Sequence, residues 1–290
     1  MSSPNRPFVV AVAGAALVAG GALLWLARDL LGSPSTAGGR SGLLELLEEV
    51  RQSAPPAQPL SSPAPKPPPR PRWVSPLTRS CPVISPPEQQ RLMDQFDRID
   101  SLITRIKIDP TNFGVRYETD SYGNALDPKP RLVVLHETVY SIGSAIQTFL
   151  TPHPRDEDQV SYHTLIGEDG EIVDLLDPLK RAFGAGNSSF NGEWVITNPD
   201  VGGSVNNFTL HLSLETPIDG EDASPSHSGY KAVQYDSTAL VLADWMRRFS
   251  IPPENITTHR FVDLGGVRAD PRSFDWEELK VRLAALGMVC

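Results

Sequence analysis

A proline-rich segment between Ala54 and Pro76 constrains the fold of this chain more than any other feature. It reads APPAQPLSSPAPKPPPRPRWVSP and carries 10 of the 28 prolines. Proline fixes φ and lacks a backbone N–H, so this stretch cannot continue a helix or an internal strand. We expect an extended, semi-rigid spacer of about 70 Å, at about 3.1 Å per residue. A ligand for a proline-binding module is the alternative.

Charge is distributed unevenly on the two sides of this spacer. Residues 1–84 hold 8 Lys+Arg and 4 Asp+Glu, a net charge of +4, whereas residues 85–290 hold 18 and 31, a net charge of −13. A domain with a net negative charge lacks the excess of cations with which proteins neutralise phosphates, so we exclude nucleic acid as a partner. We assign residues 1–30 to a membrane segment, residues 31–84 to a linker with a short amphipathic stretch, and residues 85–290 to one globular domain.

Residues 8–27 form an uncharged apolar run, FVVAVAGAALVAGGALLWLA. A helix of these 20 residues spans about 30 Å, the thickness of the hydrocarbon core of a bilayer. Arg6 precedes the run, and Trp25 stands where an interfacial aromatic residue is expected. The length of the run favours an uncleaved, single-pass signal anchor that holds the chain in a membrane. A cleaved signal peptide is the alternative.

Hydrophobic periodicity predicts helices and strands in alternation after residue 85. Residues 87–107 place apolar side chains at three- and four-residue spacings, which predicts one amphipathic helix. Residues 131–136, RLVVLH, form a continuous apolar run that is typical of a strand covered on both faces. Residues 141–150 and 234–249 have the pattern of two further helices.

Two more patterns complete the prediction of an α/β fold. Residues 162–174 indicate a hairpin, because Asp169-Gly170 supplies the positive φ of a tight turn. Residues 208–215, FTLHLSLE, alternate strictly between apolar and polar side chains, as a strand does. Asp275 is positioned to cap a last helix, with Glu278 completing a capping box. Strands that alternate with helices indicate a mixed α/β domain.

The chain has two cysteines, Cys81 just after the spacer and Cys290 at the C-terminus. In an exported domain they could pair and tie the two ends of the domain together. Two free thiols are an equally good interpretation of the sequence.

Among the six histidines, two stand out by their position. His136 ends the predicted buried strand, where the sheets of α/β proteins place functional groups, and His259 ends a second strand-like run, NITTH. Asp270 follows eleven residues later, before a proline that favours an extended backbone. Two histidines, a carboxylate and a water form a common catalytic zinc site. For any single histidine, a hydrogen-bonded or exposed imidazole is the simpler interpretation.

Five sequence blocks follow one another in an order that resembles the zinc-dependent N-acetylmuramoyl-L-alanine amidases, the family of the phage-lysozyme amidases and the peptidoglycan recognition proteins. The resemblance covers residues 131–286. It implies a central mixed β-sheet flanked by helices, with zinc in an open groove. The blocks are LVVLHET, VSYHTLIGEDGEIVDLL, KRAFGAGNSSFNG, NNFTLHLSLE and ITTHRFVDLGGVRADPRSFDW.

The resemblance implies that His136, His259 and Asp270 are the zinc ligands. Tyr162 matches the tyrosine that one branch of the family places beside the zinc. Another branch has a glutamate where this chain has Ser213, so the chain resembles the tyrosine type. Glu215, two residues further along the same strand face, is a weaker candidate for the glutamate role.

Two positions depart from the family pattern. Arg268 stands where the family often has lysine; both are cations that can stabilise an oxyanion, but arginine cannot give up a proton at neutral pH. The loop that usually reads aromatic-His-Ala-Gly and lines the substrate groove is here Phe183-Gly184-Ala185-Gly186. Its histidine is missing, so we expect a different substrate preference.

The remaining histidines and two asparagines receive simpler interpretations. We expect His163 to be structural and His211 to line the groove, because His211 shares a strand face with Ser213. His153 and His227 are interpreted as loop residues. Asn206 and Asn207 either start the strand or bind a substrate amide, and the former is favoured.

The sequence therefore predicts a membrane-anchored zinc enzyme that cleaves the amide bond between N-acetylmuramic acid and L-alanine of peptidoglycan. Zinc would activate the water and polarise the carbonyl, while Tyr162 and Arg268 would donate to the oxyanion. We expect a monomer in the inner membrane with its catalytic domain in the periplasm. The alternatives are a non-catalytic peptidoglycan-binding module of the same fold and a tethered structural protein whose spacer recruits a partner.

Overall fold

A computed structural model describes residues 63–79 and 81–290, which belong to one compact unit. The apolar run of residues 8–27 and the first part of the proline-rich segment lie outside the described residues. None of the helices in residues 63–79 and 81–290 combines the length and the apolar character of a membrane-spanning segment. The membrane segment over residues 1–30 stays a prediction.

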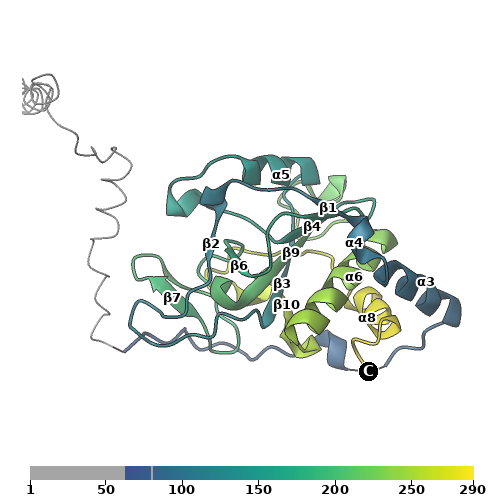
Figure 1. Ribbon diagram of the computed structural model, residues 1–290, viewed down its shortest axis with the longest axis horizontal. Coiled ribbons are helices and arrows are strands. Elements are labelled where there is room, and N and C mark those ends of the chain that lie inside the picture. Colours follow the sequence, from purple (N-terminus) through teal and green to yellow (C-terminus); the bar gives the residue numbers. More distant parts are fainter. Residues whose placement is uncertain (1–62, 80) are drawn as a thin grey trace, which may run out of the picture. The chain divides into compact units, whose positions relative to one another are not determined.

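A six-stranded sheet in the order β1-β5-β4-β9-β3-β10 forms the centre of the domain (Figure 1). Neighbouring strands run parallel except for the antiparallel pair β4–β5, which is the predicted hairpin and has Gly170 at a φ of 81°. This mixed sheet, flanked by helices, confirms the predicted α/β fold. The strands are β1 (Ile103–Arg105), β3 (Leu132–Glu137), β4 (Thr164–Ile166), β5 (Ile172–Asp174), β9 (Thr209–Leu214) and β10 (Ile256–Thr258).

The two longest strands, β3 and β9, are buried along their whole length. For β3 this follows from its continuous apolar sequence. The alternation in β9 predicts one apolar and one polar face, and the structure buries the polar face as well. The loop at Gly184 and the ring of His163 pack against His211 on that face. The polar face of β9 is therefore part of the interior.

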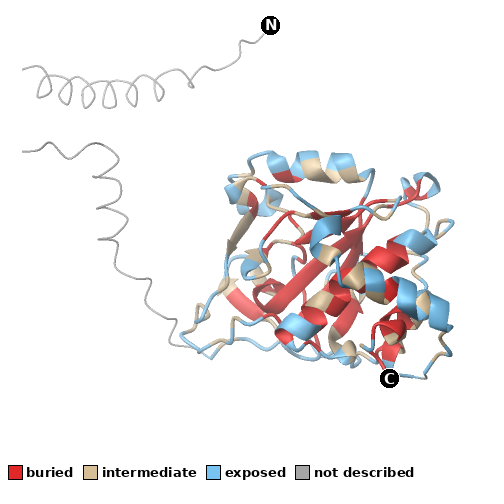
Figure 2. Ribbon diagram, turned by 45° about the vertical axis from the view of Figure 1, so that its right-hand side comes forward, coloured by how far each residue is buried: buried red, intermediate tan, exposed pale blue. Residues whose placement is uncertain are grey.

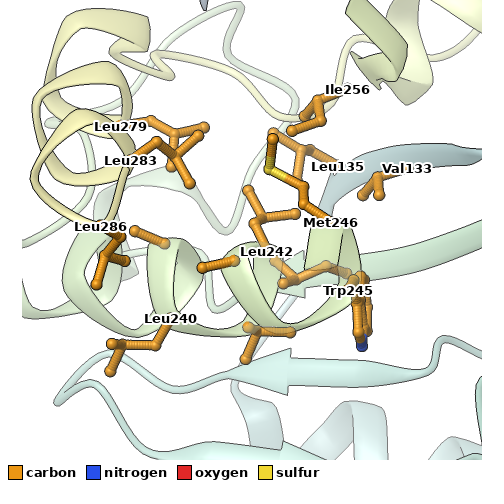
Figure 3. Packing of buried hydrophobic residues seen from close by; sticks show 14 of the residues in the cluster. Val133, Leu135, Leu240, Leu242, Trp245, Met246, Ile256, Leu279, Leu283 and Leu286 are labelled. Carbon is orange, nitrogen blue, oxygen red and sulfur yellow. The ribbon is translucent and has the colours of Figure 1, made fainter. Parts of the chain in front are cut away.

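Three helices cover the apolar face of the sheet: α3 (Pro86–Phe96), α6 (Ala232–Phe249) and α8 (Trp276–Ala285). Their apolar sides meet those of β3 and β9 in the largest hydrophobic cluster (Figure 3). Figure 2 shows the buried strands between helices whose outer sides are exposed. The cluster includes Val133, Leu135, Leu210, Leu212, Leu214, Leu240, Leu242, Trp245, Leu279 and Leu283.

Helix α5 (Ile142–Leu150) packs on the opposite face of the sheet, at its β4–β5 side. Phe149 shares a small apolar cluster with Leu165 and Val173 there. The Ser141 hydroxyl accepts a hydrogen bond from the backbone N–H of Ser144 at 3.3 Å, which caps the helix. This confirms the short helix predicted for residues 141–150.

The helix predicted over residues 87–107 is wrong in its second half. Helix α3 ends at Phe96, the one-turn helix α4 (Ile99–Leu102) follows, and the chain then enters β1. In β1, Ile103 lies opposite Ile172 of β5. Pairing with β5 and the β-branched residues of this stretch outweigh its helical periodicity.

Asp275 caps α8 as predicted, since its carboxylate accepts from the backbone N–H groups of Glu277 and Glu278. The reciprocal half of the predicted capping box is not formed. The backbone N–H of Asp275 instead donates to the Tyr235 hydroxyl at 2.7 Å, and the Glu278 carboxylate lies 2.6 Å from Arg282. The tertiary contact with α6 replaces the local one.

The remaining elements are short. They are β2 (Phe113–Val115), β6 (Lys180–Ala182), β7 (Val195–Asn198), β8 (Gly202–Ser204), α7 (His259–Val262), η1 (Pro76–Thr78), η2 (Pro110–Asn112), η3 (Asp156–Asp158), η4 (Asn206–Phe208), η5 (Ile218–Gly220) and η6 (Pro253–Asn255).

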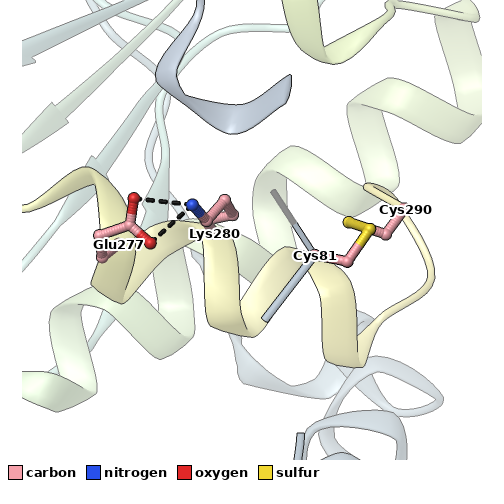
Figure 4. The surroundings of a disulfide bond; sticks show 4 residues. All are labelled: Cys81, Glu277, Lys280 and Cys290. Carbon is pink, nitrogen blue, oxygen red and sulfur yellow. Dashed lines mark hydrogen bonds and ion pairs between the residues drawn. A yellow bond between two sulfur atoms is a disulfide. The ribbon is translucent and has the colours of Figure 1, made fainter. Parts of the chain in front are cut away.

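The end of the predicted linker contacts the domain. Leu77 is 1% exposed and belongs to the main core cluster, and the indole N–H of Trp73 donates to the carbonyl of Ile256 at 3.0 Å. A disulfide joins Cys81 to Cys290 beside α8 (Figure 4). The structure thus decides between the two interpretations of the cysteines, and the bond ties the entry of the domain to its last residue.

Candidate metal centre

Three side chains from distant parts of the chain converge at the carboxyl ends of β3 and β10. His136 is the fifth residue of β3, and His259 begins α7 directly after β10. Asp270 lies in the loop that follows α7. Because β3 and β10 are parallel neighbours, their ends lie at the same edge of the sheet, which brings the two histidines together despite their separation in sequence.

The donor atoms of this group point toward one another. Oδ2 of Asp270 lies 3.2 Å from Nδ1 of His136 and 3.0 Å from Nδ1 of His259. One ligand atom of each residue lies within 4.8 Å of the others. The carbonyl of Asp270 accepts from the backbone N–H of Arg260 at 2.9 Å, which ties the loop of Asp270 to α7.

The protonation states of His136 and Asp270 suit a divalent metal. Burial lowers the pKa of His136 to about 4, so its imidazole is neutral at pH 7. Burial alone would raise the pKa of Asp270, but its contacts with His136 and His259 outweigh this effect and hold the pKa well below its usual range. Metal binding requires neutral imidazoles and an ionised carboxylate. Two histidine nitrogens and one carboxylate oxygen are a donor set that zinc uses in catalytic sites.

Tyr162 lies beside this group, two residues before β4. Its ring stacks on that of His136 with 4.4 Å between the centroids and 27° between the planes. The ring of Phe149 stands nearly perpendicular to that of Tyr162, with 5.6 Å between the centroids and 89° between the planes. Burial raises the pKa of the Tyr162 hydroxyl. The phenol therefore keeps its proton at neutral pH and is available as a hydrogen-bond donor.

Arg268 lies in the exposed part of the same loop as Asp270. Its backbone N–H donates to Oδ2 of Asp263 at 3.1 Å, and the same carboxylate holds the backbone N–H of Val267 at 2.8 Å. The positive charge of Arg268 acts on Tyr162, where it partly opposes the rise in pKa that burial causes. Arg268 is thus held near the site by its backbone, with an exposed side chain.

A groove of about 1200 Å³ opens next to these residues. Tyr162, His259, Arg268 and Asp270 all line it, whereas His136 is fully buried behind them. The acidic segment η3 is exposed and also lines the groove. The other main lining segments are residues 137–140, 159–160, 183–187, 201–204 and 267–269.

Glu215 is not placed to act at this centre. One carboxylate oxygen accepts from the backbone N–H of Ile142 at 2.7 Å and the other from that of Glu168 at 2.7 Å. The carboxylate therefore binds the N-terminus of α5 to the β4–β5 turn. Ser213, at the position of the family's glutamate, is buried, and its hydroxyl has no hydrogen-bond partner among the described residues.

His211 lies behind the centre and not in the groove, contrary to the sequence-based expectation. It is fully buried, and its Nδ1 lies 2.9 Å from Nε2 of His136. A Cβ atom at position 184 would come within 2.5 Å of the His211 ring. The glycine that departs from the family loop pattern therefore makes room for this imidazole.

The other singled-out residues have structural contacts. As predicted, His163 is structural: its Nδ1 accepts from the backbone N–H of His211 at 3.0 Å, and its Nε2 faces the Lys180 carbonyl at 3.2 Å. His153 lies 2.9 Å from the Asn112 side chain. Asn206 and Asn207 form η4 immediately before β9, and each accepts a backbone N–H from another segment.

Sequence reasoning missed Glu137, the residue after His136. Its buried carboxylate accepts from the Tyr230 hydroxyl at 2.6 Å, faces Nε2 of His227 at 3.1 Å, and pairs with the guanidinium and the backbone N–H of Arg272. Arg272 follows Asp270 by two residues. The pair therefore links the end of β3, which carries His136, to the loop that carries Asp270. A glutamate at the end of an otherwise apolar strand was the available signal.

Comparison of the sequence with known proteins places this chain in a family. The family model described as N-acetylmuramoyl-L-alanine amidase matches residues 126–273, just over half of the chain. Among solved structures, the chain is similar to a selenomethionine derivative of AmpD, with 24% identity, a TM-score of 0.46 and coverage of 63% of this chain and 95% of that one. It is also similar to AmpDh3 from Pseudomonas aeruginosa in complex with an anhydromuramic pentapeptide, with 20% identity, a TM-score of 0.39 and coverage of 52% and 58%.

One curated human protein, described as a mitochondrial SCO1 homolog, is 31% identical over 114 residues, or 35% of this chain and 38% of that protein. The chain thus spans well under half the length of this relative.

Proposed function

The chain belongs to the N-acetylmuramoyl-L-alanine amidase family, and from this premise we propose that it hydrolyses the amide bond between N-acetylmuramic acid and L-alanine of peptidoglycan. Membership confirms the family and the amidase class predicted from the sequence. The observation that carries the proposal is the convergence of His136, His259 and Asp270 beside a groove of about 1200 Å³. All three lie within the matched residues 126–273.

Zinc is the metal that this donor set fits best, because two imidazole nitrogens and one carboxylate oxygen are ligands of catalytic zinc sites. When bound, zinc supplies Lewis acidity, which polarises a carbonyl group and makes water a nucleophile near neutral pH. The chain holds two of the three donors in the required protonation states before any metal arrives, since burial lowers the pKa of His136 and the contacts of Asp270 with the two histidines hold its pKa low.

Tyr162 and Arg268 supply the polar groups that such a reaction needs outside the metal. The Tyr162 phenol stays protonated and lines the groove beside the candidate ligands. Its hydroxyl is therefore assigned as a donor to the oxyanion that forms at the attacked carbonyl. Arg268 adds a positive charge to the lining of the same groove, and it acts as a charge and not as a proton donor.

A peptidoglycan-cleavage assay on the full chain, with a second histidine variant as the control, tests the proposal. The full chain is loaded with zinc, incubated with peptidoglycan sacculi, and the released stem peptides are identified by mass spectrometry. Release is expected from the wild type, and it should stop with a chelator or with His136→Ala. His153→Ala should remain active, because His153 contacts Asn112 away from the groove. Cleavage by His136→Ala at the wild-type rate would sink the mechanism. A wild type that binds sacculi without cleaving them would identify a non-catalytic binding module.

We also propose that the chain is a monomer anchored in the inner membrane, with this domain in the periplasm. The apolar run of residues 8–27 supports the anchor, and the Cys81–Cys290 disulfide is typical of an oxidising compartment. Removal of residues 1–30 should move the protein from the membrane fraction to the soluble fraction. Protection of the domain from protease added to spheroplasts would contradict the orientation.

A further inference from the structure

His211 occupies the middle of β9 and presents its ring toward the buried side of the metal centre. Its Nδ1 lies 2.9 Å from Nε2 of His136. The other nitrogen of His136, Nδ1, faces Asp270 at 3.2 Å on the side where the candidate ligands converge. The two ring nitrogens of His136 therefore face different partners: Nδ1 faces the candidate ligands, and Nε2 faces His211.

This arrangement determines which nitrogen of His136 carries the proton when a metal binds. A metal held together with Asp270 and His259 needs the lone pair of Nδ1 of His136, so the proton must be on Nε2. That N–H then points at Nδ1 of His211, which accepts it. Ligand histidines commonly donate their second N–H to a fixed acceptor, which holds the tautomer and the ring orientation. In this chain the acceptor is another imidazole.

The surroundings of His211 hold its ring in one place. The ring of His163 stacks on it at 5.9 Å with 9° between the planes, and Nδ1 of His163 accepts the backbone N–H of His211. On another side, Gly184 lies so near that a Cβ there would be 2.5 Å from Cγ and Nδ1 of His211. The imidazole is therefore a pre-positioned acceptor and not a mobile side chain.

One nitrogen of the buried His211 ring, Nε2, lacks a hydrogen-bond partner among the described residues. A buried polar group without a partner destabilises the folded state. An aliphatic side chain in β9 would avoid that cost, which indicates that the imidazole serves the site and not the stability of the sheet.

We propose that His211 is a positioning residue for the metal centre: its Nδ1 accepts the Nε2–H of His136 and so fixes the tautomer and orientation in which His136 binds metal. Gly184 contributes to the same arrangement, because a side chain at position 184 would occupy the space of the His211 ring. The inference rests on the proposed metal site and adds a determinant of metal affinity to it.

The first experiment measures the zinc affinity of the full chain by competition with a chromophoric chelator at pH 7.5. His211→Leu removes the acceptor but keeps an apolar side chain, and it should weaken zinc binding by about 10- to 100-fold, the usual effect of losing such a partner. His211→Asn places an oxygen near the position of Nδ1 and should restore most of the affinity. Melting temperatures with and without zinc separate the two roles, because a positioning role reduces the zinc-induced rise while a structural role lowers the metal-free value.

A glycine pair in one loop provides a matched second test. Gly184→Ala should weaken zinc binding in the wild type, because its methyl group displaces His211, and should have no further effect in a His211→Ala background. Gly186→Ala is the control, since a Cβ at position 186 meets nothing within 4 Å. Loss of affinity in Gly184→Ala that is the same in both backgrounds would overturn the coupling.

The outcomes separate this inference from the proposed function. If the wild type binds no zinc, the metal site itself is wrong. If the wild type binds zinc and His211→Leu binds it equally well, only the inference about His211 is overturned. A Co²⁺-loaded sample adds a spectroscopic check, since reorientation of His136 should change the visible absorption of the metal in His211→Leu but not in Gly186→Ala.

Discussion

The two faces of β9 are both buried, yet they have opposite chemistry. On one face, Leu210, Leu212 and Leu214 pack with α6 and α8 in the main core. On the other face, His211 and Ser213 are equally buried, but each has a polar atom without a hydrogen-bond partner among the described residues. Burial of the apolar face stabilises the folded state. Burial of the unpartnered polar atoms on the other face destabilises it. We therefore expect substitutions on the apolar side of β9 to change the stability of the fold. Substitutions on the polar side should change the activity of the site.

The largest expected effect is on the polar side, at His136, whose strand pairs with β9. His136→Ala should reduce stem-peptide release by more than about a thousandfold, because it removes a donor of the metal site. The free energy of unfolding of the metal-free protein should change far less than the activity. Chemical denaturation in the presence of a chelator, run beside the activity assay, checks both. A large decrease in the free energy of unfolding, enough to explain the loss of activity, would contradict the proposed difference between the two faces.

Leu212→Ala changes the apolar side at a neighbouring position. It should lower the free energy of unfolding by about 3–5 kcal/mol, the cost of a buried leucine together with the cavity it leaves. The rate per folded molecule should stay near the wild-type value. Leu179→Ala is the control, since Leu179 is 59% exposed and should change stability by less than about 0.5 kcal/mol. A large drop in turnover with normal stability in Leu212→Ala would contradict the separation.

Tyr162→Phe removes one hydroxyl from the site without changing the stacking on His136. It should lower kcat by about 100- to 1000-fold, the effect of deleting one oxyanion donor, and leave zinc affinity unchanged. Tyr235→Phe is matched to it, because the Tyr235 hydroxyl binds the backbone of Asp275 away from the groove. That variant should lose stability but not kcat. Steady-state kinetics on a defined muropeptide distinguish the two tyrosines.

Lowering the pH should reduce the stability of the fold through the buried histidines near the polar face of β9. Burial lowers the pKa of His136 to about 4 and that of His163 to about 3, and it lowers the pKa of His211 as well. Between pH 6.5 and 4 the unfolded chain takes up protons at these residues and the folded chain does not. Stability is therefore fully present above pH 6.5 and falls as the pH drops, by up to about 1.4 kcal/mol per pH unit for each histidine. Urea denaturation of the metal-free protein across this range measures the slope, and a flat profile would refute the neutral state of these side chains.

The smallest effect is expected at Ser213. Ser213→Ala removes a buried hydroxyl without a hydrogen-bond partner in the described residues, so the free energy of unfolding should stay constant or rise by up to about 1 kcal/mol. Thr164→Val is the matched loss of a hydroxyl that does have a partner, Asp174 at 2.7 Å, and it should be destabilising. Differential scanning calorimetry of the two variants tests the sign. Destabilisation by Ser213→Ala would show that the hydroxyl is satisfied after all.

Local sequence patterns predicted elements whose cause is local. The continuous apolar run of β3, the alternation of β9 and the capping residue Asp275 each depend on neighbours a few positions away, and the structure has all of them. The same reasoning failed over residues 87–107, where the end of a helical pattern became β1. Its partner, β5, is some 70 residues away in the sequence, beyond the reach of any periodicity.

The order of the sequence blocks determined the family and named His136, His259, Asp270, Tyr162 and Arg268 as site residues, and the structure brings the three candidate ligands together. Only the tertiary structure decided that His211 lies behind His136 and not in the groove, that Glu215 caps α5, that Glu137 links two site loops, and that Cys81 meets Cys290. The physical reason is that these contacts depend on strand register and loop packing between segments far apart in the chain. A sequence pattern reports which face a side chain takes, and the fold decides what that face meets.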